Sequence, residues 1–81
     1  MNCFFVYILN SIQYPDRHYT GITRDVEKRL AAHNAGQSLH TSKFKPWRLE
    51  TYVAFSDEIK ARAFKKYLKS GSGCAFAKKR L

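Results

Sequence analysis

Two short runs of the sequence decide the fold: FFVYIL at residues 4–9 and HYTGIT at residues 18–23. Both are dense in aromatic and β-branched side chains, which favour strands over helices. Residues 10–17 between them contain Asn, Ser, Pro and Asp, the residue types of turns. Two strands joined by so short a connection are most simply an antiparallel hairpin.

Beyond the hairpin, the sequence predicts a helix and a third strand. A helix is expected over residues 26–33, because Thr23 or Asp25 can accept hydrogen bonds from the amides of its first turn. Residues 37–46 are polar and basic, which indicates a loop. Residues 47–55 alternate with the period of a strand, with Leu49, Thr51, Val53 and Phe55 on one side, so they predict a strand.

A second long helix follows, with Ser56 or Asp57 as its cap and an end before residues 70–73. Residues 75–81 are expected to add one short, basic helical turn. The order β-β-α-β-α predicts the α+β class, with a small, mostly antiparallel sheet, helices packed on it, and one domain over residues 1–81. The apolar side chains at helical spacing in the second helix are Ile59, Ala63, Phe64, Tyr67 and Leu68.

The net charge of +9 comes from 15 basic and 6 acidic side chains, and these are unevenly distributed. Residues 59–81 hold eight basic residues and no acidic one, whereas residues 1–58 are nearly balanced. A solvated helix face normally mixes both signs. The basic segment therefore favours a polyanionic partner, first of all nucleic acid, with an anionic membrane surface or an acidic protein as the alternatives.

The two cysteines, Cys3 and Cys74, lie near opposite ends of the 81-residue chain and form no CxxC pair. They predict reduced thiols in a reducing compartment. The longest apolar run, residues 3–9, is far shorter than the roughly 18–20 residues that span a bilayer, and it lacks the pattern of a signal peptide. These features predict a cytoplasmic protein without a membrane partner.

Several common kinds of site are excluded by spacing. The four glycines form no phosphate-binding or dinucleotide-binding loop, and the histidines and cysteines lack zinc-finger spacing. What remains is a pair of tyrosines on neighbouring strands, Tyr7 and Tyr19, followed by Arg29 and His33 one helical turn apart. Arginine offers a planar fork to phosphate oxygens, and tyrosine or histidine can move a proton, so this set suits phosphodiester chemistry.

These residues resemble the GIY-YIG nuclease domain family. Its paired signature is similar to Phe5-Val6-Tyr7 and Tyr19-Thr20-Gly21, and its Arg and following Tyr or His are matched by Arg29 and His33. The resemblance runs over nearly the whole chain. It includes residues 67–73, which resemble the small stand-alone bacterial subfamily of such domains.

The resemblance implies a three-stranded antiparallel sheet flanked by helices, and metal-dependent hydrolysis of a DNA phosphodiester in DNA repair or processing. Tyr19, together with Tyr7, would position or deprotonate the attacking water. Arg29 would steady the scissile phosphate, and His33 would carry a proton or bind phosphate. Gly21 would let backbone and substrate approach closely. The cofactor that this activity implies is a divalent cation, Mg²⁺ or Mn²⁺.

The chain departs from the family at the residue that would hold this cation. The family uses a Glu in the middle of the last long helix, and Lys65 occupies that position. An ammonium group cannot ligate Mg²⁺, which requires oxygen ligands, so the metal ligand is not identified. Glu58 lies two turns earlier, about 10 Å away along the helix axis, which is too far to replace it.

Three interpretations therefore stay open, and the third is a basic domain that binds an acidic protein or RNA, with Tyr7 and Tyr19 as core side chains. The first two act on nucleic acid through the same surface. One is an endonuclease with weak sequence specificity, and the other is a catalytically inactive nucleic-acid-binding module in which Lys65 contacts phosphate directly. DNA is the expected partner, with RNA or an acidic protein as alternatives, and no protein partner is identified. The residues expected to contact nucleic acid are His40, Lys43, Lys45, Lys65, Lys66, Lys69, Lys78, Lys79 and Arg80.

Overall fold

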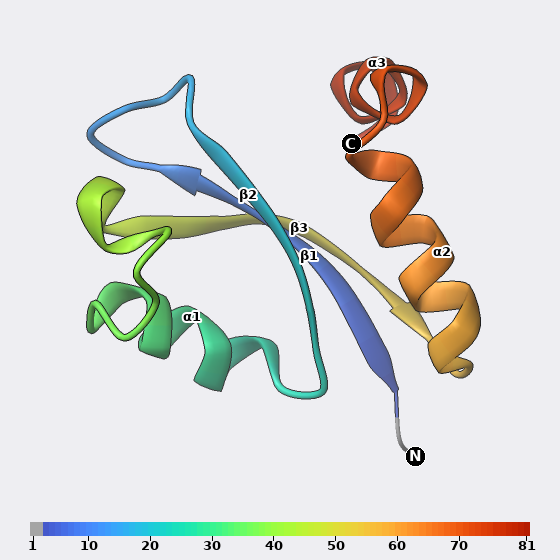
Figure 1. The fold of residues 1–81 in the computed structure, drawn as a ribbon, viewed down its shortest axis with the longest axis horizontal. Helices are drawn as coiled ribbons and strands as arrows, with labels where there is room; N and C mark the ends of the chain where they lie inside the picture. Colours follow the sequence, from blue (N-terminus) through green and yellow to red (C-terminus); the bar gives the residue numbers. More distant parts are fainter. Residues whose placement is uncertain (1–2) are drawn as a thin grey trace.

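The computed structural model describes residues 3–81 and contains a three-stranded antiparallel sheet in the order β2-β1-β3 (Figure 1). The central strand is β1 (Phe4–Ser11), and the edge strands are β2 (His18–Thr23) and β3 (Trp47–Phe55). The α+β class and the antiparallel sheet expected from the sequence are thereby confirmed. Strand β1 runs two residues further than predicted, because Asn10 and Ser11 still pair with β3.

Two aspartates start the helices that flank the sheet. Asp25 accepts a hydrogen bond from the Lys28 amide at 3.0 Å and begins α1 (Val26–Asn34). Asp57 accepts one from the Ile59 amide at 2.9 Å and begins α2 (Glu58–Leu68). Each cap satisfies an amide that has no partner within its helix. The predicted loop between α1 and β3 contains a short 3₁₀ helix, η1 (Ser42–Phe44).

The sheet carries a separate apolar core on each face, because successive side chains of β1 point to opposite sides. Val6 and Ile8 face α2 and α3, whereas Tyr7 and Leu9 face α1 and η1. Figure 1 shows α1 on one side of the sheet and α2 on the other. The side chains that join the first core from α2 and α3 are Ala61, Phe64, Leu68, Phe76 and Ala77, and those that join the second are Tyr19, Leu30, Phe44, Trp47 and Leu49.

The predicted apolar stripe of α2 is partly wrong. Ile59 is 79% exposed and Ala63 is also exposed, while Ala61 is fully buried. The inward face is therefore formed by Ala61, Phe64 and Leu68, with Lys65 half-buried beside them. The sheet decides which side of α2 is buried, so the apolar character of Ile59 and Ala63 is not enough to turn them inward.

The C-terminal helix α3 (Gly71–Arg80) is longer than the short turn predicted over residues 75–81, and it adds one helix to the predicted order. The Ser70 side chain caps it by accepting a hydrogen bond from the Gly73 amide at 3.1 Å. A Cβ at Gly73 would overlap the backbone carbonyl of Tyr67. Glycine at this position therefore lets α3 start tightly against the end of α2, rather than marking a loop.

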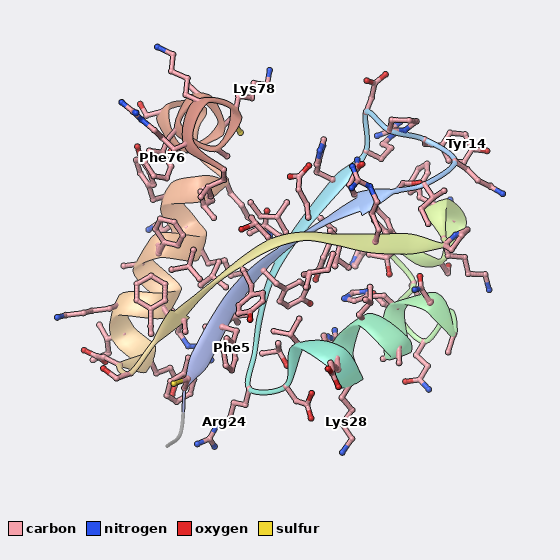
Figure 2. The ribbon with its side chains drawn as sticks, turned by 180° about the vertical axis from the view of Figure 1, so that it is seen from behind. Phe5, Tyr14, Arg24, Lys28, Phe76 and Lys78 are labelled. Atoms are coloured by element: carbon pink, nitrogen blue, oxygen red, sulfur yellow. The ribbon has the colours of Figure 1, made fainter. Side chains whose placement is uncertain are left out.

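Figure 2 shows how α3 divides its side chains between the core and solvent. Phe76 packs edge-on against the ring of Phe64, whereas Lys78 projects outward from the helix. Within residues 3–81, no helix is long and apolar enough to cross a membrane. Cys3 and Cys74 are free thiols.

Candidate functional site

Tyr7 lies at the centre of the sheet on the α1 face and is only 1% exposed. Its partner across the β1–β2 ladder is Gly21. A Cβ at position 21 would overlap the hydroxyl of Tyr7, so only glycine leaves room for the phenol at this point. Gly21 therefore leaves the space on β2 into which the Tyr7 phenol packs.

His33 lies in the last turn of α1, is completely buried, and contacts Tyr7. Its Nε2 atom lies 3.0 Å from the Tyr7 hydroxyl, and its Nδ1 atom lies 2.7 Å from the hydroxyl of Thr41. Burial, and then the charge of Arg29, lower the pKa of His33 below its ordinary value. The imidazole is therefore neutral near pH 7, with one nitrogen free to accept a proton.

The direction of the Tyr7–His33 bond follows from the partners of the phenol. Burial raises the pKa of Tyr7, although a hydrogen bond from Arg29 opposes this shift, so the phenol keeps its proton. Arginine can only donate, so Nε2 of His33 is the acceptor for that proton. The Nδ1–H group of His33 then donates to Thr41, and the three side chains form a buried chain from the loop to the sheet.

Thr41 is a site residue that the sequence did not identify. It is buried between α1 and β3, and its backbone carbonyl accepts a hydrogen bond from Nε1 of Trp47 at 2.9 Å. The amide side chain of Asn34 binds both the backbone N–H and the carbonyl of Trp47. Nothing in the composition of the loop distinguishes Thr41 from its neighbours, since only the fold brings it against His33.

Arg29 and Tyr19 form the outer layer of the site. A hydrogen bond with Tyr7 raises the pKa of Arg29, burial opposes this shift, and Tyr19 adds to it. The ring of Tyr19 lies 4.9 Å from that of His33 and 6.2 Å from that of Tyr7, measured between centroids. Tyr19 is half-buried and Arg29 is exposed, so these two residues can reach a ligand in solution.

Helix α2 reaches the same site around the edge of the sheet. Because β2 is an edge strand, no further strand separates Tyr19 from α2. The Lys69 ammonium lies 6.0 Å from the centroid of the Tyr19 ring. Lys65 is one turn earlier on the same helix, and burial, followed by the charges of Lys69 and Arg62, lowers its pKa.

The site does not fit a divalent cation of the kind that needs carboxylate ligands. Within residues 3–81, no group of three or more His, Cys, Asp or Glu side chains is placed to hold a metal ion. Glu58, the acidic residue of α2, is engaged by Arg62 at 2.7 Å. Lys65 offers no lone pair to a metal while it is protonated, and its charge repels one.

The other predicted contact residues are not gathered at this site. His40, Lys43 and Lys45 lie in the exposed segment around η1, next to the C-terminal end of α1. Lys78 projects from α3, away from α1 (Figure 2). Three further predicted contact residues are exposed on α2 or α3: Lys66, Lys79 and Arg80.

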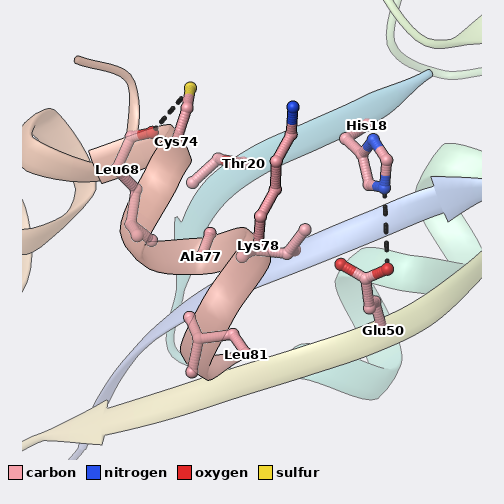
Figure 3. A pocket seen from close by; sticks show the side chains of 9 residues that line it. His18, Thr20, Glu50, Leu68, Cys74, Ala77, Lys78 and Leu81 are labelled. Atoms are coloured by element: carbon pink, nitrogen blue, oxygen red, sulfur yellow. Dashed lines mark hydrogen bonds and ion pairs between the residues drawn. The ribbon is translucent and has the colours of Figure 1, made fainter. Parts of the chain in front are cut away.

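A separate cavity of about 350 Å³ lies on the opposite face of the sheet, between β2 and α3 (Figure 3). Its floor is apolar and includes Ile8, Leu68 and Ala77. At its rim His18 approaches Glu50 at 3.5 Å. Lys78 lines this cavity, so this residue of α3 is remote from the face that carries Tyr7.

Comparison with known proteins assigns a family to this arrangement. The model of the GIY-YIG catalytic domain matches residues 3–76. A UPF0213 protein of Cupriavidus pinatubonensis is 42% identical over 65 residues, which cover 75% of this chain and 72% of that protein. The solution NMR structure of the UPF0213 protein BH0048 from Bacillus halodurans matches with a TM-score of 0.57 at 28% identity, covering 95% of this chain and 83% of the other.

Proposed function

Because this chain belongs to the GIY-YIG catalytic domain family, a family of nucleases that act on nucleic acid, we propose that it binds the DNA backbone at Tyr19 and Arg29 and hydrolyses a phosphodiester there. One observation carries the proposal: the Tyr7 hydroxyl lies 3.0 Å from Nε2 of His33, the ring of Tyr19 lies 4.9 Å from that of His33, and both tyrosines act to raise the pKa of Arg29. The four residues that suit phosphodiester chemistry thus form one connected cluster.

The two layers of the cluster have different roles in this proposal. Arg29 is exposed, and its free guanidinium edge holds the phosphate oxygens through charge-assisted hydrogen bonds. Tyr19 stands beside it and positions the attacking water with its hydroxyl. Tyr7 and His33 are buried, so they act as positioning residues that fix the direction of Arg29 and the tilt of Tyr19.

The charge of the chain supports DNA as the partner. The net charge of +9 creates a field that attracts a polyanion and speeds its approach. Contacts to phosphate carry little sequence information. The proposed activity is therefore weakly sequence-specific and directed at DNA structure, such as a flap, a nick or a single strand.

The divalent cation that these nucleases generally use has no evident ligands here, and this favours a second candidate function. Lys65 occupies the position from which the resemblance expects the metal to be bound, and among residues 3–81 no group of three or more His, Cys, Asp or Glu side chains is placed to hold one. The second candidate is a module that binds DNA through the same surface without cutting it. A lysine at position 65 suits this function, because binding alone needs no metal ion.

Cleavage of a labelled DNA panel separates the two candidates. Duplex, nicked, flap and single-stranded DNA are incubated with Mg²⁺, Mn²⁺ or EDTA, using the wild type, Tyr19→Phe and Arg29→Ala. Cutting that disappears in both variants supports hydrolysis at this cluster. Binding without any cutting supports the second candidate, and a protein that neither binds nor cuts DNA contradicts both.

A further inference from the structure

Lys65 of α2 and Lys69, the residue that caps the end of this helix, stand on the side that faces the edge strand β2. Phe64, the residue before Lys65, packs against Phe55 of β3 with 5.4 Å between ring centroids, so it points toward the opposite edge. Lys69 approaches Tyr19 of β2. Lys65 is one turn before Lys69 and therefore lies on the same, β2-facing side.

Neither lysine has an anionic partner. Among residues 3–81, the ion pairs are His18 with Glu50 and Arg62 with Glu58, and both leave the two lysines unpaired. The charged groups that act on Lys65 are Lys69 and Arg62, which repel it. A half-buried ammonium among like charges is unfavourable, and the pKa of Lys65 is lowered accordingly.

An anion that binds beside Lys65 offsets the unfavourable free energy of this ammonium group. It would compensate the desolvated charge of Lys65 and neutralise its repulsion with Lys69, so the free energy of binding is largest for an anion held between them. Arg29 approaches Tyr19 from α1. Lys69 and Arg29 therefore approach the same tyrosine from the two sides of the sheet edge, and Lys65 lies one turn before Lys69. In the described chain, the charged groups that act on Lys65 and Arg29 include no carboxylate.

We propose that Lys65 and Lys69, with Arg29 on the other side of Tyr19, form a direct binding site for a phosphate group of nucleic acid that requires no divalent cation. The inference rests on the DNA binding proposed above and specifies how the phosphate is held. The ammonium groups supply the positive charge that a metal ion would otherwise supply, acting as point charges at the edge of β2.

The test is DNA binding measured by fluorescence anisotropy in EDTA and in Mg²⁺. Lys65→Met and Lys69→Met each remove one charge and keep an unbranched side chain. Lys60→Met is the matched control, because Lys60 is an exposed lysine of the same helix and outside the proposed site. Circular dichroism verifies that each variant is folded.

Wild type is expected to bind in EDTA at least as well as in Mg²⁺, because Mg²⁺ acts only as a counterion that competes for the DNA phosphates. Loss of a charge-assisted contact should weaken binding about tenfold in Lys65→Met and in Lys69→Met, and should reduce the slope of log K against log salt by about 0.9. Lys60→Met changes only the overall charge and should weaken binding less than about twofold. Inorganic phosphate should compete with DNA for binding to the wild type. It should not compete with DNA for binding to Lys65→Met.

If wild type binds DNA but Lys65→Met behaves like Lys60→Met, or if EDTA abolishes binding, the direct phosphate site is wrong and DNA binding stands. If an acidic peptide such as polyglutamate binds as tightly as DNA, the site is not selective for phosphate. If wild type does not bind DNA at all, the proposed function itself is wrong.

Discussion

The hydroxyl of Tyr7 lies 3.0 Å from Nε2 of His33, 26 residues further along the chain, and both side chains are buried. The bond joins the central strand to the last turn of α1 and so fixes the helix against the sheet. Arg29 is one turn before His33 on the same helix. The bond therefore also determines where the guanidinium group stands relative to Tyr19.

Removing the Tyr7 hydroxyl should destabilise the protein. Tyr7→Phe leaves Nε2 of His33 buried without a partner, which should lower the free energy of unfolding by about 1–3 kcal/mol. Urea denaturation measures the change. Tyr52→Phe is the control, because Tyr52 is 52% exposed and its hydroxyl needs no internal partner. Equal stability of the two variants would show that the buried bond contributes nothing.

A methyl group at position 21 should disrupt the sheet. In Gly21→Ala the new Cβ overlaps the Tyr7 phenol, which is fixed by its own bond to His33. The overpacking should lower stability by about 1–3 kcal/mol, observed as a lower melting temperature. Gly71→Ala places a methyl group where no atom lies within 4 Å, and this control should keep or slightly increase stability. A harmless Gly21→Ala substitution would contradict the close packing.

His33 should make the stability of the fold depend on pH. Its pKa in the folded protein is lowered from 6.5, so the unfolded chain takes up a proton more readily than the folded one. Stability is therefore complete above pH 6.5 and falls as the pH decreases from there toward the lower folded pKa. Urea midpoints measured from pH 8 to pH 5 test this.

The pH dependence has a matched pair of controls. His33→Gln removes the titrating group and should flatten the profile below pH 6.5, at some cost in stability. His40→Gln replaces an exposed histidine and should leave the decline in place. A profile that is unchanged in His33→Gln would assign the decline to another group.

Thr41 should hold His33 in one tautomer. Thr41→Val keeps the shape of the side chain and removes the oxygen that accepts from Nδ1, whereas Thr41→Ser keeps that oxygen. The ¹⁵N chemical shifts of His33 are expected to show a proton on Nδ1 in wild type and in Thr41→Ser. In Thr41→Val the tautomer should change or mix, and stability should fall by about 1–3 kcal/mol. Unchanged shifts in Thr41→Val would remove Thr41 from the site.

Reversing the charge at position 65 should make binding depend on metal. Lys65→Glu places a carboxylate, an oxygen ligand for Mg²⁺, among the cations beside Tyr19. DNA binding by this variant should be weak in EDTA and recover with Mg²⁺, and any cleavage should be stronger than in wild type. Lys60→Glu makes the same change of charge at an exposed position and should show no response to Mg²⁺. A Lys65→Glu variant that ignores Mg²⁺ would place residue 65 outside the site.

Much of the fold could be predicted from local sequence. The apolar, β-branched runs specify the hairpin, and Asp25 and Asp57 mark the starts of both long helices because their carboxylates bond to nearby amides. Such signals act within a few residues and need no tertiary context. The rotation of α2 was predicted less well, because Ile59 and Ala61 are both apolar and only the position of the sheet decides which is buried.

From the residues alone followed the residue types of the site, the basic charge and a lysine at position 65, where the resemblance implies a glutamate. Only the tertiary structure decided that Tyr7 and His33 are buried partners, that Thr41 completes their chain, and that Lys69 reaches Tyr19 around an edge strand. These contacts join segments that are 8 to 50 residues apart. Their physical reason is the packing of helices on both faces of one small sheet, which no local propensity encodes.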